Sequence, residues 1–397
     1  MSSNAKVRLE GLDVLRGISA IMIILFHVYY LFGYANKTIF VNFIPRLDIG
    51  VQLFFALSAF SLFYGYEKRI TQTDGLSKFY INRFFRIAPL FYLCIFIYSL
   101  ITQKYLNSSI NVADLLINFT FTFGLIPGKN ESFVWAGWSL GIEWIFYFLF
   151  PLFVILCKNL KSTLLFYIIS MLVVIRFDYL GIQLQKVSYS AYKLNYLNQL
   201  MFFISGIVGY KLYREISFEK WYVRFISLLI MISITYVYFF TNLIGNILGE
   251  ILISFNIINI ILYFANCPPK ILVNKFFQML GASSFGLYLL HPLVIIYFLY
   301  SGILYNNHVI PSDDNVGFLT HVVLTLMLTI PIAFLSYKYY ESPAMLFAKS
   351  KSDILLKEHE ANPSRIAALV QNKIKFIITG FIVFSIFVIF INTGWRF

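Results

Sequence analysis

Charged residues are scarce in this chain, because Asp, Glu, Lys and Arg make up only 12% of its 397 residues. A soluble globular domain usually carries about twice that fraction. Cysteine is also rare: Cys94, Cys157 and Cys267 stand far apart, so we expect neither a disulfide framework nor a zinc site, and no bound metal. The sequence also lacks a Walker-type phosphate loop, so nothing in it indicates ATP-driven transport.

Apolar residues are abundant instead, at 59% of the chain, with 44 Phe and 28 Tyr. A helix needs about 20 mostly apolar residues to cross a bilayer, and stretches of this kind recur from one end of the sequence to the other. The expected fold is therefore an all-α, polytopic membrane helix bundle. We predict eleven spans, at about residues 12–34, 48–66, 86–103, 137–157, 162–180, 196–213, 224–243, 247–266, 277–300, 318–340 and 373–391.

The formal net charge of +13 would suggest nucleic acid as the partner of a soluble protein. In a membrane protein, it indicates the excess of Lys and Arg in cytoplasmic segments that sets orientation. Most Lys and Arg residues fall in such segments if the N-terminus is cytoplasmic, and eleven spans then place the C-terminus outside. The first apolar run contains Arg16 and lacks a small-residue cleavage site, so we expect it to be retained as a span.

Ionisable residues within spans are costly and usually functional, and the first span holds Asp13, Arg16 and His27. Arg16 and His27 are eleven residues apart, so they share one helix face at a separation of about 16 Å along the axis. Asp13 lies one turn before Arg16 and can pair with it. A snorkelling arginine and a hydrogen-bonded core histidine would explain the pattern equally well.

The fourth span begins with Trp138 and Ser139 and carries Glu143 about as far below the outer face as His27. A carboxylate beside a histidine fixes its tautomer and makes it a general base, so a contact between Glu143 and His27 would create a catalytic pair. The alternative is a structural glutamate that joins two helices. Further candidates for substrate contacts are Asp13, Asp48, Trp138 and Ser139.

His291 precedes Pro292 in the ninth span and lies in the outer half of the membrane by the same count. One interpretation is a polar group that lines the acceptor pocket. The other is a histidine that bonds the backbone carbonyl freed by Pro292.

Arg83 and Arg86 stand at the cytoplasmic end of the third span, three residues apart on one helix face. Two guanidinium groups in this arrangement suit a polyanion such as the phosphates of a nucleotide cofactor. Anchoring at the cytoplasmic face explains the pair without a ligand. Glu341, at the end of the tenth span, either braces these arginines or ends its helix.

An ordered set of six motifs covers residues 9 to about 345. The motifs are LDVLRGISA followed by His27, GVQLFFALSAF at 50–60, FYINRFFRIAP at 79–89, WSLGIEWIFYFLFP at 138–151, FGLYLLHPLV at 285–294 and YKYYESP at 337–343. Together they resemble the membrane acyltransferase-3 family, which contains bacterial O-antigen and other polysaccharide O-acetyltransferases. One position differs from the family pattern, since the family usually has Gly after the Ser of the second span, where this chain has Ala59.

The resemblance implies a ten-helix core, acetyl-CoA entering from the cytoplasm and an acceptor glycan on the extracytoplasmic side. Carried onto this sequence, His27 matches the catalytic histidine and Arg16 the motif arginine. Arg83 and Arg86 match the basic pair near the cofactor, and Glu143 matches the motif glutamate.

The resemblance also sets the domain organisation. We expect an acyltransferase domain at 1–345, a cytoplasmic linker at 346–372, and an eleventh transmembrane helix with a short tail at 373–397. Some family members continue into an extracytoplasmic hydrolase-like domain. Without one, transfer would finish within the membrane or pass to a separate protein.

The expected function is transfer of an acetyl or other short acyl group to a sugar hydroxyl of O-antigen or another surface polysaccharide, in the bacterial inner membrane. A polysaccharide or lipid-linked sugar transporter is the alternative, with Arg16, His27 and Glu143 as a proton relay. Dependence on acetyl-CoA separates the two, because a transporter would not consume it. A scaffold without chemistry leaves the polar residues within the spans unexplained.

Overall fold

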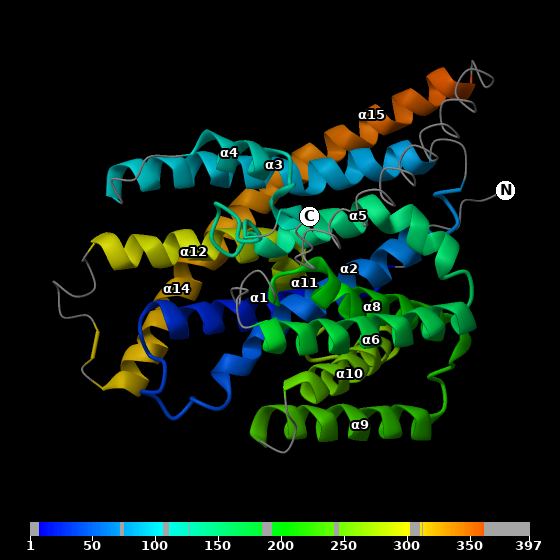
Figure 1. The fold of residues 1–397 in the computed structure, drawn as a ribbon, viewed down its shortest axis with the longest axis horizontal. Helices are drawn as coiled ribbons and strands as arrows, with labels where there is room; N and C mark the ends of the chain where they lie inside the picture. Colours follow the sequence, from blue (N-terminus) through cyan, green and yellow to red (C-terminus); the bar gives the residue numbers. More distant parts are fainter. Residues whose placement is uncertain are drawn as a thin grey trace.

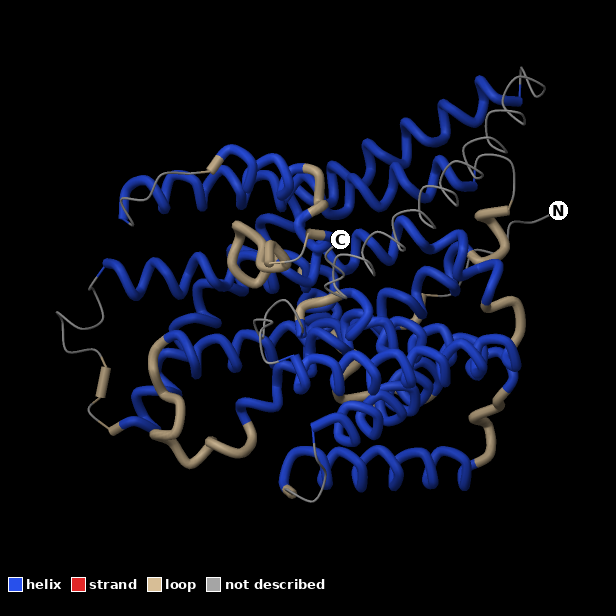
Figure 2. The backbone as a smooth tube through the Cα atoms, in the orientation of Figure 1, coloured by secondary structure: helices blue, strands red, loops and turns tan. Residues whose placement is uncertain are grey.

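The computed structural model describes residues 8–71, 75–105, 111–126, 128–184, 193–241, 246–301, 310–311 and 313–360. Within these ranges the chain is helical and contains no β-strand (Figure 2). The long helices run alongside one another and form one bundle (Figure 1). The predicted all-α fold is therefore confirmed.

Ten long helices correspond to the first ten predicted spans. They are α1 (Glu10–Leu31), α2 (Gly50–Tyr66), α3 (Gly75–Tyr105), α5 (Trp138–Leu156), α6 (Leu160–Leu184), α8 (Tyr196–Glu215), α9 (Trp221–Phe240), α10 (Asn246–Asn266), α12 (Ser284–Ser301) and α14 (Asp314–Ser336). Shorter elements complete the described chain: η1 (Ile44–Ile49), α4 (Val112–Phe119), η2 (Phe123–Leu125), α11 (Lys275–Ala282), the π-helical turn η3 (Tyr337–Glu341) and α15 (Ser342–Glu360).

Nine helical stretches in the described ranges are long and apolar enough to cross a bilayer. The helix α8 is not among them, since it carries several polar and charged side chains, yet it is buried along most of its length within the bundle. Its surroundings therefore consist largely of other helices. The predicted eleventh span, 373–391, lies outside the described residues.

Two helices are longer than their apolar segments. The helix α3 begins at Gly75 rather than near residue 86, so Arg83 and Arg86 lie inside it. The helix α14 continues through η3 into α15, and residues Asp314–Ser352 form one stretch of 39 residues. The described part of the predicted linker, 346–360, is thus helical.

Two glycines allow helices of the bundle to approach closely. A Cβ atom on Gly206 of α8 would lie 2.0 Å from the backbone oxygen of Ala56 on α2. A Cβ atom on Gly281 of α11 would lie 2.2 Å from the backbone oxygen of Asp13 on α1. No side chain fits at either point, so glycine sets the positions of α1 and α2 relative to their neighbours.

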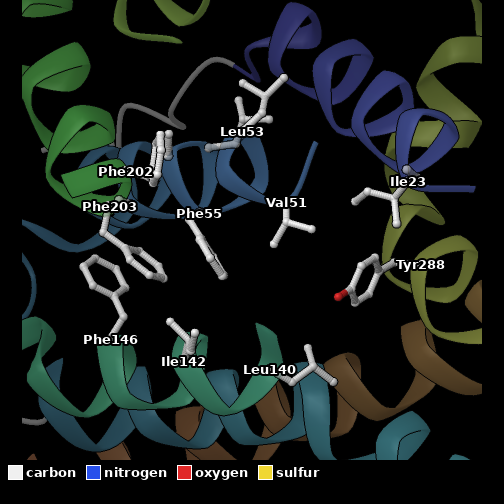
Figure 3. Close-up of a cluster of buried hydrophobic side chains, with 14 of the residues drawn as sticks. Ile23, Val51, Leu53, Phe55, Leu140, Ile142, Phe146, Phe202, Phe203 and Tyr288 are labelled. Carbon is white, nitrogen blue, oxygen red and sulfur yellow. The ribbon is translucent and has the colours of Figure 1, made fainter. Parts of the chain in front are cut away.

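Stacked aromatic rings fill the core between α2, α5 and α8. The ring of Phe203 on α8 stacks on Phe146 of α5 at 4.2 Å and on Phe55 of α2 at 4.5 Å between centroids (Figure 3). Pairs of this geometry contribute beyond their buried area. They hold the helices that form one wall of the cavity described below.

A charged cluster joins the ends of α2 and α8. The carboxylate of Glu67 accepts a 2.6 Å hydrogen bond from the Tyr210 hydroxyl and forms ion pairs with Lys211 and Arg214. Burial raises the pKa of Glu67, but the hydrogen bonds from Lys211 and Tyr210 and the two nearby cations outweigh it, so the pKa lies below 4.5. This cluster fixes the end of α2 against the end of α8.

Candidate active site

A cavity of about 400 Å³ lies between α1, α2, α3, α5 and α12. Its lining residues on α2 extend from Val51 to Tyr66, a distance of roughly 22 Å along the helix axis. The cavity is therefore elongated in the direction of α2. Its polar lining consists of Arg16, Arg83, Arg86, Glu143, Ser58, Ser61, Ser139, Ser284, Tyr66, Tyr147 and Tyr288.

Arg16 enters the cavity from α1 and is held on two sides. One guanidinium nitrogen lies 2.6 Å from a carboxylate oxygen of Asp13, and the other lies 2.5 Å from the hydroxyl of Ser61. The predicted pairing of Asp13 with Arg16 is therefore confirmed. Arg8 binds the second Asp13 oxygen at 2.7 Å, so both oxygens of this carboxylate are engaged by arginines.

Arg83 lies between two tyrosine rings at the end of the cavity that Tyr66 lines. Its guanidinium carbon is 5.6 Å from the ring centroid of Tyr66 and 5.9 Å from that of Tyr147. Cations over aromatic faces are attracted by the ring quadrupole, which fixes the side chain. Its buried Nε atom makes no hydrogen bond to the described residues, and the residue lines the cavity.

Arg86 lies one turn further along α3, and its guanidinium carbon is 6.0 Å from the ring centroid of Phe285. One of its nitrogens contacts the sulfur of Met345 at 3.3 Å. Glu341 interacts with Arg86 electrostatically, but within the described ranges no carboxylate forms an ion pair with Arg83 or Arg86. The cavity therefore carries positive charge that an anionic ligand can neutralise.

Glu143 belongs to the cavity wall rather than to the histidine. The hydroxyl groups of Ser58 and Tyr147 both donate to its Oε1 atom, the first at 2.7 Å. Among the described residues no hydrogen bond joins Glu143 to His27. The two residues do not form the pair considered from the sequence, and a catalytic role for Glu143 stays a prediction.

His27 meets His291 instead. Nδ1 of His27 lies 3.0 Å from Nε2 of His291, and the ring centroids are 5.0 Å apart. Nδ1 of the fully buried His291 ring lies 3.0 Å from the backbone oxygen of Leu287. This carbonyl is that of Leu287 rather than that of Tyr288, which Pro292 leaves without its helical donor, and His291 is not among the residues that line the cavity. A role in the acceptor pocket stays a prediction.

Tyr288 separates the histidine pair from the cavity. Its hydroxyl lies 2.7 Å from the Ser139 hydroxyl and donates to the backbone oxygen of Ala136, which joins α12 to the start of α5. Its ring centroid is 6.3 Å from that of His291. Figure 3 shows Tyr288 facing the same space as Ile23 and Val51.

Of the predicted substrate-binding residues only Ser139 is among the residues that line the described cavity, and Asp13, Asp48, Trp138 and His291 are not. Asp48 lies in η1 with an exposed side chain and interacts electrostatically with Lys193 and Glu250. Trp138 packs edge-on against Phe55, with 6.1 Å between ring centroids. Their roles stay predictions, whereas Ser139 does line the cavity.

Sequence reasoning did not single out Ser58, Tyr66, Tyr147 or Tyr288. Tyr147 lies one helical turn from Glu143, and Tyr288 lies one turn from His291, so helical spacing placed both beside predicted residues. Within the described ranges no group of three or more His, Cys, Asp or Glu side chains is arranged to hold a metal ion.

A family model described as an acyltransferase domain matches residues 9–338, which contain α1 to α14. This chain belongs to the membrane acyltransferase-3 family. The acyltransferase is also similar to a protein of Acidianus two-tailed virus named as the candidate acetyltransferase ORF330, with 28% identity over 257 residues, which is 62% of this chain and 72% of the viral protein. No solved structure matches it.

The family and the helices together define a multi-pass membrane acyltransferase. The matched region contains every residue of the cavity except Met345 and also contains both histidines.

Proposed function

We propose that this acyltransferase moves an acetyl or other short acyl group from acyl-CoA to a sugar hydroxyl of an extracytoplasmic glycan. The observation that supports this proposal most directly is the cavity with Arg83 and Arg86 at one end and no carboxylate paired with either, among the residues that the structure describes. Guanidinium groups without a carboxylate partner are costly within a membrane protein and usually serve a function, and an anion bound in the cavity would neutralise them.

The charge distribution along the cavity fits an acyl-CoA. Arg83, Arg86 and Arg16 would hold its phosphates at the cytoplasmic end, with Arg83 offering its buried Nε donor. Acetyl-CoA, when bound, would supply the acyl group as a thioester. The opposite end is lined by Val51, Phe55 and other apolar side chains, which suits the uncharged arm and the acyl group rather than the phosphates.

The length of the cavity supports the same assignment. Its lining spans roughly 22 Å of α2, which is most of the hydrocarbon thickness of about 30 Å. A donor held by the arginines would therefore extend to Tyr288, the wall residue nearest the histidine pair. This arrangement brings a cytoplasmic donor to an acceptor on the outer side without moving the acceptor through the membrane.

His27 would act where the two substrates meet. It would take the proton from the attacking sugar hydroxyl as general base, or carry the acyl group itself. This role is supported by the contact of His27 with His291, whose ring lies 6.3 Å from that of the cavity residue Tyr288. Glu143, held by Ser58 and Tyr147, would contribute from the cavity wall.

The acyl group and the acceptor have different support. The name of the viral relative favours acetyl. The motifs that resemble polysaccharide O-acetyltransferases favour a glycan, and we propose O-antigen or another surface polysaccharide. The charged cluster at the ends of α2 and α8 is consistent with a cytoplasmic N-terminus in the bacterial inner membrane.

Transfer of radiolabel from acetyl-CoA tests the proposal. Membranes that contain the wild-type protein or His27→Ala would be incubated with labelled acetyl-CoA, and label in protein and in glycan would be followed. We expect label in a glycan only with the wild type, at equal amounts of folded protein. Equal labelling by His27→Ala would refute the role of His27, and glycan transport without consumption of acetyl-CoA would identify a transporter.

A further inference from the structure

The hydrogen bonds around the two histidines determine which nitrogen atoms carry protons. Nδ1 of His291 lies 3.0 Å from the backbone oxygen of Leu287. A carbonyl oxygen can only accept, so the proton of this hydrogen bond must reside on Nδ1 of His291.

His291 is a neutral ring in this environment. Its side chain is fully buried, and its two nitrogens face a carbonyl group and another imidazole rather than a carboxylate. An imidazolium there would be a buried charge without a counter-ion, which is strongly unfavourable. With its proton on Nδ1, a neutral His291 presents a lone pair at Nε2.

The lone pair of His291 in turn fixes His27. Because Nε2 of His291 is an acceptor, Nδ1 of His27 must be the donor across the 3.0 Å between them. The contact with His291 therefore favours a proton on Nδ1 of His27.

We propose that His291 is a positioning residue that fixes the tautomer of His27 and leaves the lone pair of His27 on Nε2, where it receives the proton of the acceptor hydroxyl. This inference rests on the proposed role of His27 as a base. Hydrogen bonds then run from His27 through His291 to the Leu287 carbonyl. This series has the role that a carboxylate has beside other histidine bases, because it selects one tautomer and one ring orientation. No proton moves along it before the acceptor binds.

A carboxylate partner would also stabilise a charged His27 before the reaction, and His291 does not. A neutral partner keeps the resting pair uncharged within the apolar bundle and avoids the cost of a buried ion pair. This explains why Glu143 can be committed to Ser58 and Tyr147 without depriving His27 of an orienting group.

The tautomer of His27 is directly measurable. The full chain, labelled with ¹⁵N-histidine and reconstituted in lipid vesicles, contains only five histidines, and a His27→Gln variant identifies the signals of His27 in solid-state NMR spectra. We expect Nδ1 of His27 to be protonated in the wild type. An unprotonated Nδ1 would overturn the proposal.

Three variants separate positioning from packing. His291→Leu fills the same space with an apolar side chain but removes the hydrogen-bond acceptor. We therefore expect the His27 tautomer to change and transfer to fall by about 10- to 100-fold. His291→Gln can place an amide oxygen near the former Nε2, so it should restore the Nδ1 proton and part of the activity. The matched control is His321→Leu, since His321 lies 3.1 Å from the carbonyl four residues before it but meets Tyr34 instead of His27.

The outcomes distinguish this inference from the proposed function. An unchanged His27 tautomer in His291→Leu would overturn the inference, as would full activity of that variant while His27→Ala is inactive. Full activity of His27→Ala would refute the proposed function, whatever the spectra show. A wild-type-like spectrum and activity in His321→Leu, with both altered in His291→Leu, would support the inference.

Discussion

The hydroxyl of Ser58 on α2 lies 2.7 Å from the carboxylate of Glu143 on α5. The Tyr147 hydroxyl donates to the same oxygen, and the ring of Tyr147 lies against the guanidinium of Arg83. The carboxylate, the tyrosine and the arginine therefore form one connected wall of the cavity. Substitution of Glu143 should therefore alter donor binding at Arg83 more directly than it alters His27.

The ring and the hydroxyl of Tyr147 should have separable effects. Tyr147→Leu removes the aromatic face beside Arg83, and we expect the KM for acetyl-CoA to rise about 2- to 30-fold, the range of a cation–π contact. Tyr147→Phe keeps the face and should change this KM much less. Steady-state kinetics in membranes measure both values, and equal effects of the two variants would contradict the stacking role.

Arg83 and Arg86 should contribute to donor binding. Because hydrogen bonds to charged groups are worth about 1.5–3 kcal/mol, we expect Arg83→Ala or Arg86→Ala to raise the KM for acetyl-CoA about 10- to 100-fold. Arg214→Gln is the control, since Arg214 is paired with Glu67 outside the cavity. The assignment fails if the control raises the KM as much as the cavity variants do.

Tyr288 should limit the length of the acyl group. Its ring closes the apolar end of the cavity, and its hydroxyl bonds Ser139 and the backbone of Ala136. Tyr288→Ala removes this wall, so we expect transfer of butyryl from butyryl-CoA to increase relative to acetyl. Tyr288→Phe retains the ring and should keep the acetyl preference, and competition between the two donors measures the ratio.

Gly206 should be intolerant of any side chain, whereas Gly209 on the same helix should tolerate alanine. A Cβ atom on Gly206 would lie 2.0 Å from the backbone of Ala56, but on Gly209 its nearest neighbour would be 3.6 Å away. Overpacking costs about 1–3 kcal/mol or more. Thermal denaturation followed by fluorescence-detected gel filtration should show a lower Tm for Gly206→Ala only, and equal Tm values would contradict the close approach.

Glu67 should stabilise the fold in a pH-dependent way. Glu67→Gln leaves the nearly buried Lys211, which is 4% exposed, without its anion, and we expect a loss of about 1–3 kcal/mol. The pKa of Glu67 is lower in the folded protein, below 4.5. The stabilisation is therefore fully present above the unfolded pKa and is lost as pH falls through the folded pKa.

Melting of wild type and Glu67→Gln across this pH range checks the prediction. The difference between their Tm values should be constant near neutral pH and should shrink below pH 4.5, because a protonated Glu67 resembles glutamine. A difference that persists unchanged at lower pH would show that the charge of Glu67 is not its source.

The order and positions of the helices were predictable because apolarity is a local property of each span. Even α8 was predicted, since its apolar run is interrupted only near its ends by residues such as Asn198 and Arg214. The helix α3 begins earlier than its predicted span, because the polar residues before Arg83 are helical but too hydrophilic for hydropathy to detect. The length of a helix beyond the membrane depends on packing, here between α3 and α15.

The sequence predicted which residues line the site better than it predicted which of their side chains contact one another. The spacing of Asp13 and Arg16, and of Arg83 and Arg86, lies within one helix, so helical geometry was sufficient. The partner of His27 lies on another helix, and equal depth in the membrane does not show which helices are neighbours. Close approaches at Gly281 and Gly206 determine which helices are neighbours, and such tertiary contacts cannot be read from the spacing within one helix.

The continuous helix from Asp314 to Ser352 has a mechanical consequence. At 1.5 Å per residue its 39 residues measure roughly 58 Å, far more than a bilayer core of about 30 Å. Met345, which touches Arg86, lies on the same rod as the projecting end of α15 (Figure 1). A displacement of that end would therefore also move Met345, and with it the contact with Arg86 at the arginine end of the cavity.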